Sequence, residues 1–133
     1  MNLLTVYVIK HRDAVAGDIR AAAQRILDRG FAKFVRHASF GNVESGYADR
    51  VGAVCLLGAF EPSSGSSAED LAPQALNIIA TWLPVDTNRT HVGDRIVTWN
   101  NASERTKDEV LGMLQTVADK VEAGILEVKV HTN

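Results

Sequence analysis

The chain has 133 residues, of which 46% are hydrophobic and 23% are charged, and its formal net charge is −2. This size and composition suffice for one hydrophobic core, which excludes wholesale disorder. The near-neutral charge excludes a strong overall attraction to nucleic acid or to acidic membranes. We therefore expect a single domain over residues 1–133.

The compartment is indicated by what the sequence lacks. No apolar run approaches the ~20 residues that span a bilayer, and the N-terminal residues show no secretory-signal pattern. The only cysteine, Cys55, cannot form an internal disulfide, which suits a reducing compartment. We expect a soluble cytoplasmic protein without membrane association.

Charge is unevenly divided along the chain, with a net +3 over residues 1–50 and −5 over the remainder. Such a split can create a basic face, although solvated helix surfaces show the same pattern. Aromatic residues for base stacking are scarce, so a nucleic-acid partner is disfavoured but not excluded. The candidate members of this face are Arg25, Arg29, Lys33 and Arg36.

The first third of the chain predicts a strand followed by a helix. Residues 3–10 alternate and are rich in β-branched and aromatic types, which is typical of a strand. Asp13 is a plausible N-cap for an amphipathic helix that ends at Gly30. The next residues, 31–54, are rich in glycine and are compatible with a hairpin around residues 42–49. In this stretch we expect Phe31, Phe34 and Phe40 to be buried.

The middle of the chain contains an apolar run, a loop and a second helix. Residues 54–60 are uniformly apolar, so periodicity cannot distinguish a buried strand from a short buried helix. Residues 61–67 are a Ser/Gly loop, and residues 68–83 predict a helix that starts regularly only near Pro73. Residues 85–105 read as a long polar connector.

The last third predicts a helix and a strand. Thr106 and Glu109 form a capping-box pattern ahead of helically spaced apolar residues, and Gly124 ends that helix. Residues 125–131 then alternate as a strand. The resulting prediction is an α+β fold, with about three main helices packed with a small sheet that includes the N- and C-terminal strands. An open edge of that sheet would be a site for homodimerisation.

Several motifs recur together in one known family. They are an Ala-rich helix ending in Gly-Phe at 30–31, Cys-Leu-Leu-Gly-Ala at 55–59, Trp-Asn-Asn at 99–101, and Arg-Thr-Lys-Asp-Glu-Val at 105–110. With these motifs the chain resembles a family of small uncharacterised proteins from actinobacteria and their bacteriophages, over about residues 14–122. The resemblance implies a fold neighbourhood and an origin but no activity, because the family is a domain of unknown function. The chain has Asn101 where that family often has Asp.

No recognisable catalytic or cofactor motif is present. The four histidines lack zinc-site spacing. Cys55 lies in an apolar run, where cysteine usually packs as a small core residue. No phosphate-binding glycine loop and no nucleophile elbow occurs. We expect no metal, no cofactor and no intrinsic catalysis.

Two classes of function stay open. The first is an accessory protein, encoded by or derived from a phage, that binds a host macromolecule, with protein favoured. The second is a small ligand-binding domain or enzyme that uses the connector 99–105, where Trp, two Asn and Arg precede a helix N-terminus. The same residues can instead pack and cap that turn. The candidate ligand- or partner-binding residues are Arg89, Arg95, Trp99, Asn100, Asn101 and Arg105.

Overall fold

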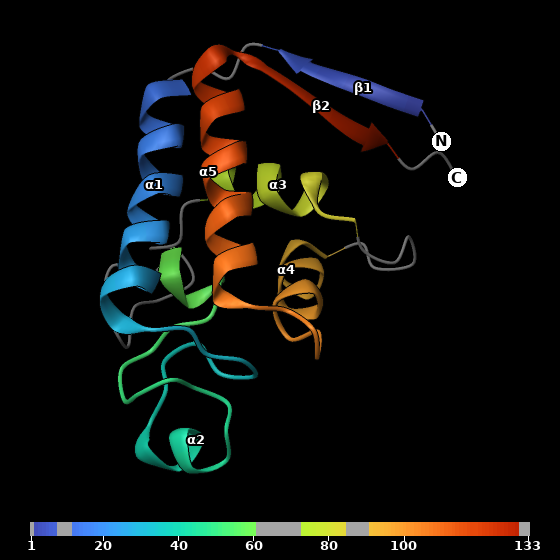
Figure 1. Ribbon diagram of the computed structural model, residues 1–133. Helices are drawn as coiled ribbons and strands as arrows, with labels where there is room; N and C mark the ends of the chain where they lie inside the picture. The colour runs from blue at the N-terminus through green and yellow to red at the C-terminus, as the bar shows by residue number, and fades with distance from the viewer. Residues whose placement is uncertain (1, 8–11, 61–72, 85–90, 131–133) are drawn as a thin grey trace.

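The body of the protein is a group of packed helices (Figure 1). The computed structural model describes residues 2–7, 12–60, 73–84 and 91–130. The elements are β1 (Asn2–Tyr7), α1 (Arg12–Arg29), α2 (Phe40–Glu44), the 3-10 turn η1 (Gly58–Phe60), α3 (Pro73–Trp82), α4 (Val92–Asn100), α5 (Lys107–Ala123) and β2 (Ile125–Val130). Residues 31–52, called the lobe below, lie at one end of the body and include α2.

Helices α1 and α5 form the centre of the fold, side by side and antiparallel (Figure 1). Their apolar residues recur at three- and four-residue steps, so each helix has one apolar face. These faces bury Val15, Ala16, Ile19, Ala22 and Ile26 of α1 and Val110, Leu114, Val117, Ala118 and Val121 of α5. Burial of each larger side chain contributes roughly 1.5–3 kcal/mol. Leu27, which continues the apolar spacing of α1, is instead exposed.

Residues 53–60 are all buried and cross the same core. The run that periodicity could not assign is neither a strand nor an α-helix, since it ends in the short turn η1 against α1. Its backbone forms isolated bridges with the lobe, Phe31 with Val54 and His37 with Val54. Segment 53–60 is therefore held in place by the burial of its side chains in the core and by its backbone bridges to the lobe.

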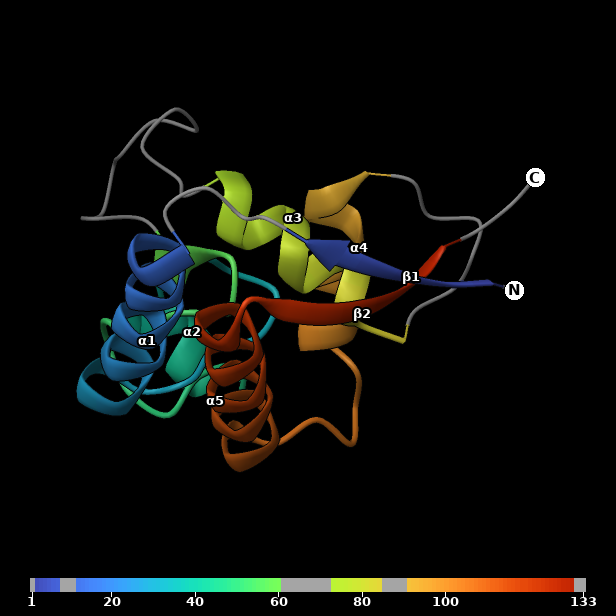
Figure 2. The same ribbon diagram turned by 90° about the horizontal axis from the view of Figure 1, so that it is seen from above.

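The prediction of an α+β fold is wrong. The core consists of α1, α3, α4, α5 and the buried segment 53–60, so the body is all-helical in the described residues. Strands β1 and β2 pair antiparallel as a two-stranded ribbon, which Figure 2 shows running from the end of α5 over the side where α3 and α4 lie. Two strands are too few to form a layer of a fold. Residues 8–10 and 131, which the expected strands included, lie outside the described residues.

Residues 85–105 do not form one long connector, because they contain helix α4 (Val92–Asn100). This helix has no side-chain cap, since the N-cap residue His91 makes no capping hydrogen bond. Its stability comes from burial of Ile96 and Trp99 against the core. Residues 85–90 lie outside the described part.

The lobe also differs from expectation. The hairpin predicted around residues 42–49 is wrong, because α2 (Phe40–Glu44) occupies its first half, capped by Ser39 and Asn42. Phe31 is buried as expected, whereas the exposed fraction of Phe34 is 59% and that of Phe40 is 67%. Tyr47 is exposed as well, so the glycine-rich lobe turns three of its aromatic residues outward.

The helix-end signals are largely confirmed. Gly30 follows α1 with φ 100°, and Gly124 follows α5 with φ 82°, both in the left-handed region that glycine adopts without strain. Helix α3 begins at Pro73 as expected, and residues 68–72 lie outside the described part. The expected N-cap Asp13 lies inside the first turn of α1 instead.

Thr106 caps α5. Its hydroxyl accepts a hydrogen bond from the backbone N–H of Glu109 at 3.2 Å, as the capping-box pattern predicts. The carboxylate of Glu109 receives the Arg105 guanidinium at 2.8 Å and lies 3.3 Å from the Thr106 hydroxyl. In a full capping box the Glu109 carboxylate would accept from the backbone N–H of Thr106; here that carboxylate forms an ion pair with Arg105.

We predict that Thr106→Ala lowers the free energy of unfolding by about 1 kcal/mol, because one N–H of the first turn loses its acceptor. The matched control is Thr116→Ala, which removes an exposed threonine from the interior of the same helix. Urea denaturation of both variants checks the prediction. Equal midpoints for the two variants would contradict the cap.

Candidate binding site between the lobe and helix α4

The connector predicted to carry the site starts in the last turn of α4. Trp99 is buried, and the Arg105 guanidinium carbon lies 3.8 Å from the centroid of its ring system. Nε of Arg105 also donates to the Trp99 carbonyl at 2.9 Å. Arg105 therefore closes the turn between α4 and α5 through stacking, a hydrogen bond and its ion pair with Glu109.

Asn100 is the most deeply buried polar residue described, with an exposed fraction of 1%. Its Oδ1 accepts from the backbone N–H of Leu56 at 2.9 Å. Its Nδ2 donates to the Ala32 carbonyl at 3.1 Å and to Oδ1 of Asn101 at 3.0 Å. The amide thus joins α4 to the buried segment 53–60 and to the start of the lobe, and its donors and acceptor are satisfied.

Asn101 extends this network to the backbone of the lobe. Its Oδ1 accepts from the N–H of Phe34 at 2.8 Å, while Nζ of Lys33 donates to the Ala102 carbonyl at 2.6 Å. Phe34 has φ 68° and is the only non-glycine with positive φ among the described residues. That conformation is strained for a residue with a Cβ. The two connector contacts hold it in place.

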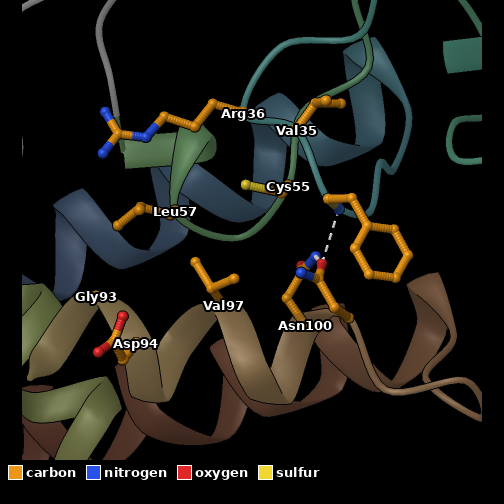
Figure 3. Close-up of a pocket in the computed structure, with 10 residues that line it drawn as sticks. Val35, Arg36, Cys55, Leu57, Gly93, Asp94, Val97 and Asn100 are labelled. Atoms are coloured by element: carbon orange, nitrogen blue, oxygen red, sulfur yellow. Dashed lines mark hydrogen bonds between the residues drawn. The ribbon is translucent and has the colours of Figure 1, made fainter. Parts of the chain in front are cut away.

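A pocket of about 340 Å³ opens next to this network (Figure 3). Arg36 of the lobe and Asp94 of α4 lie on opposite walls, with Leu57, Cys55 and Val97 between them. The pocket thus combines an apolar floor with walls of opposite charge. The full lining is Phe34, Val35, Arg36, Cys55, Leu57, Gly93, Asp94, Val97, Asn100 and Asn101.

The upper wall of the pocket is fixed by a close backbone approach. A Cβ on Gly58 would lie 2.2 Å from the carbonyl oxygen of Arg36, so only glycine fits there. The N–H of Gly58 in turn donates to Sγ of Cys55 at 3.3 Å, and the N–H of Cys55 donates to the Arg36 carbonyl. Cys55 is buried, as the apolar run predicts, and it forms part of the floor of the pocket.

Arg95 lies outside this pocket and is buried between α3 and α4. Nε donates to the Ala80 carbonyl at 2.8 Å and Nη2 to the Leu83 carbonyl at 3.3 Å. A cation at the C-terminal carbonyls of a helix is favourably placed. The structure therefore gives Arg95 a role in joining the two helices. Arg89 lies outside the described residues.

The four cations of the predicted basic face are distributed among different contacts. Nη1 of Arg25 donates to the Ala59 carbonyl at 2.6 Å, and Lys33 is bound to the connector. Arg29 lines a second pocket, of about 510 Å³, together with Arg50. Arg50 itself donates to the Arg29 carbonyl at 2.8 Å and to the Asp28 carbonyl, which caps the end of α1.

Only part of this site was visible in the sequence. Asn100, Asn101 and the connector were recognised, but the pocket was not, because Val97 and Asp94 were assigned to an irregular segment. The exposure of Phe34 was missed as well, since nothing in a Lys-Phe-Val run indicates positive φ. The one usable signal for α4 was the spacing of Val92, Ile96 and Trp99.

Two further features of the described residues concern metal binding and membrane insertion. No group of three His, Cys, Asp or Glu side chains lies close enough to hold a metal ion among the residues that the structure describes. Within the same residues, no helix has the length and apolar character needed to cross a membrane. His11 and His131 lie outside them.

These features define a small helical domain with one polar network and an adjoining pocket. The chain belongs to the family of unknown function DUF6197, whose model matches residues 10–120. This agrees with the expected resemblance to a domain of unknown function over about residues 14–122. The comparison with curated proteins and the comparison with solved structures found no match.

We predict that Asn100→Ala lowers the free energy of unfolding by about 3 kcal/mol, because the N–H of Leu56 and the carbonyl of Ala32 lose a buried partner. Asn101→Ala is the comparison variant, and because this residue is less buried it should cost about 1 kcal/mol. Chemical denaturation monitored by tryptophan fluorescence measures both. Equal losses for the two variants would show that Asn100 is not the central contact.

Proposed function

We propose that the protein is an accessory protein, encoded by or derived from an actinobacteriophage, that acts in the host cytoplasm by binding a host protein. The motif pattern at 55–59, 99–101 and 105–110 supports the origin, since it resembles proteins of actinobacteria and their phages. The binding surface is the outward face of the lobe. The observation that carries this proposal is the exposed, conformationally strained Phe34.

Phe34 and Tyr47 form an exposed aromatic pair, with ring centroids 4.9 Å apart and exposed fractions of 59% and 44%. Phe40 and Val51, on the same lobe, are exposed as well. Aromatic side chains are enriched in protein interfaces and carry a large share of binding energy. A lobe that turns most of its large apolar residues toward solvent has the composition of an interface rather than of a core.

The backbone of Phe34 strengthens the case. Strained residues persist where the surrounding structure holds them, and they cluster at functional positions. Here the amide of Asn101 holds the strained residue, and the product is a phenyl ring in solvent rather than in the core. A glycine would adopt the same φ without strain, so the presence of phenylalanine favours a role for the ring itself.

A protein partner is favoured over nucleic acid. Lys33, the cation next to Phe34, donates to the Ala102 and Ser103 carbonyls of the connector. Phosphate binding would require cations that extend from the aromatic pair to the backbone of a nucleic acid. The overall net charge of −2 points in the same direction.

The alternative, a small ligand-binding domain or enzyme using the connector 99–105, has weaker support. The polar groups of Asn100 and the guanidinium of Arg105 are used in internal hydrogen bonds. Glu104, in the same connector, has a pKa below its ordinary value because of a hydrogen bond from its own backbone and one from the Ser103 hydroxyl. Native mass spectrometry of the protein purified from its host tests this alternative, because a retained small molecule would favour it.

The proposal is tested by affinity purification from a nuclease-treated actinobacterial lysate, followed by mass spectrometry and a binding titration with the purified partner. We predict that Phe34→Gly weakens binding to that partner at least about tenfold, a typical loss for an aromatic anchor. The same change should leave the free energy of unfolding unchanged or raise it, because it removes an exposed ring and relieves the positive φ.

The matched control is Leu27→Ala, which truncates an exposed apolar residue of α1 outside the lobe and should leave the affinity unchanged. Size-exclusion chromatography of the purified protein reports whether the partner is a second copy of the chain. Full affinity of Phe34→Gly, or loss of all binding after nuclease treatment, would refute the proposal.

A further inference from the structure

We propose that the pocket beside Phe34 receives one bulky apolar side chain of an extended peptide segment of the partner, and that a lysine or arginine of that segment pairs with Asp94. This inference rests on the proposed function and specifies the chemistry of the partner. The expected ligand is a peptide in which a bulky apolar residue lies close to a lysine or arginine.

The floor of the pocket suits an apolar side chain. Its volume of about 340 Å³ lies at the lower end of the roughly 300–1,000 Å³ typical of small-molecule sites. Leu57, Cys55 and Val97 give it an apolar floor, and Val97 on α4 is 37% exposed. An apolar side chain placed there would cover these groups and exclude water from them.

The negative charge of Asp94 favours a ligand that carries a lysine or arginine near its apolar side chain. Asp94 lies in the first turn of α4, is exposed, and is on the pocket wall opposite Arg36 (Figure 3). Within the described residues, its carboxylate has no hydrogen bond or ion pair of its own. A cation of the peptide is therefore attracted to the α4 wall, which favours one orientation of the ligand.

The walls are held in place before any ligand binds. Asn100 joins α4 to segment 53–60, Asn101 joins it to the backbone of Phe34, and Gly58 packs against the Arg36 carbonyl. A preformed pocket loses little conformational entropy on binding. Phe34 lines the pocket at the end where Asn100 and Asn101 lie, so its ring would border the inserted apolar side chain.

The test uses a phage-displayed library of random peptides as the probe, selected on the immobilised wild-type protein. Each enriched peptide is then tested on Val97→Trp, which fills the pocket from a half-exposed position, and on the matched control Leu27→Trp, which adds the same ring to an exposed position of α1 outside the lobe and the pocket. We expect enriched peptides that carry Trp, Phe, Leu or Met within three positions of Lys or Arg. Val97→Trp should lose them and Leu27→Trp should keep them.

The charge is tested by a swap on the best peptide. Asp94→Lys should weaken its binding about tenfold or more, and a peptide with Glu in place of its cation should recover binding to this variant. Asp18→Lys, at an exposed position of α1, should change neither affinity. Circular dichroism and thermal unfolding confirm that every variant is folded before its affinity is compared.

Several results would overturn the inference. They are a library without enriched peptides, peptides that Val97→Trp still binds, enriched peptides with acidic instead of basic residues, and an unchanged affinity of Asp94→Lys. If Val97→Trp retains the host partner while Phe34→Gly loses it, the pocket inference fails and the proposed function stands. If Phe34→Gly also retains the partner, both fail.

Discussion

The side chain of Asn100 is the interaction on which the arrangement of this small protein depends. Three segments meet at the end of α4: the helix itself, the apolar run 53–60 and the start of the lobe. None of them is paired with the others through a continuous ladder of backbone hydrogen bonds, so their buried polar groups need another partner. One amide supplies a donor and an acceptor to two of these segments at once. A hydrophobic residue of the same size would fill the space but would leave both backbone groups unsatisfied.

What lies at the surface follows from this buried contact. Because Asn100 fixes the end of α4, the next residue is placed where its amide oxygen meets the backbone of Phe34. The ring of Phe34 is then directed away from the core, and the space left between the lobe and α4 becomes the pocket. The polar residues of the connector thus act on the surface indirectly. They shape a site whose exposed members, Phe34, Asp94 and Val97, come from segments that the sequence had not assigned to any regular structure.

How far the sequence could predict the structure depended on whether the signal was local. Helix α5 was predicted almost to the residue, because Thr106 caps its start and Gly124 its end, both through contacts with neighbouring residues in the sequence. Helix α4 was missed, since it lacks a side-chain cap and is stabilised by Ile96 and Trp99 in the distant core. The fold class was wrong because alternating runs at both ends were taken as part of a layer, whereas the core is made by helices. Of the site, the two asparagines were identified, but the pocket and the outward turn of Phe34 arise from contacts between residues more than sixty positions apart.

The position of Cys55 gives the protein a built-in chemical probe. It is the only cysteine of the chain, it lines the pocket, and the exposed fraction of the residue is 5%. A maleimide or disulfide reagent would therefore modify a single thiol, and the residue that carries it lines the pocket. The rate of labelling becomes a measure of occupancy, because anything that fills the pocket slows the reaction without any engineered tag. The wild-type thiol of the purified protein can thus report binding even where the identity of the ligand is still open.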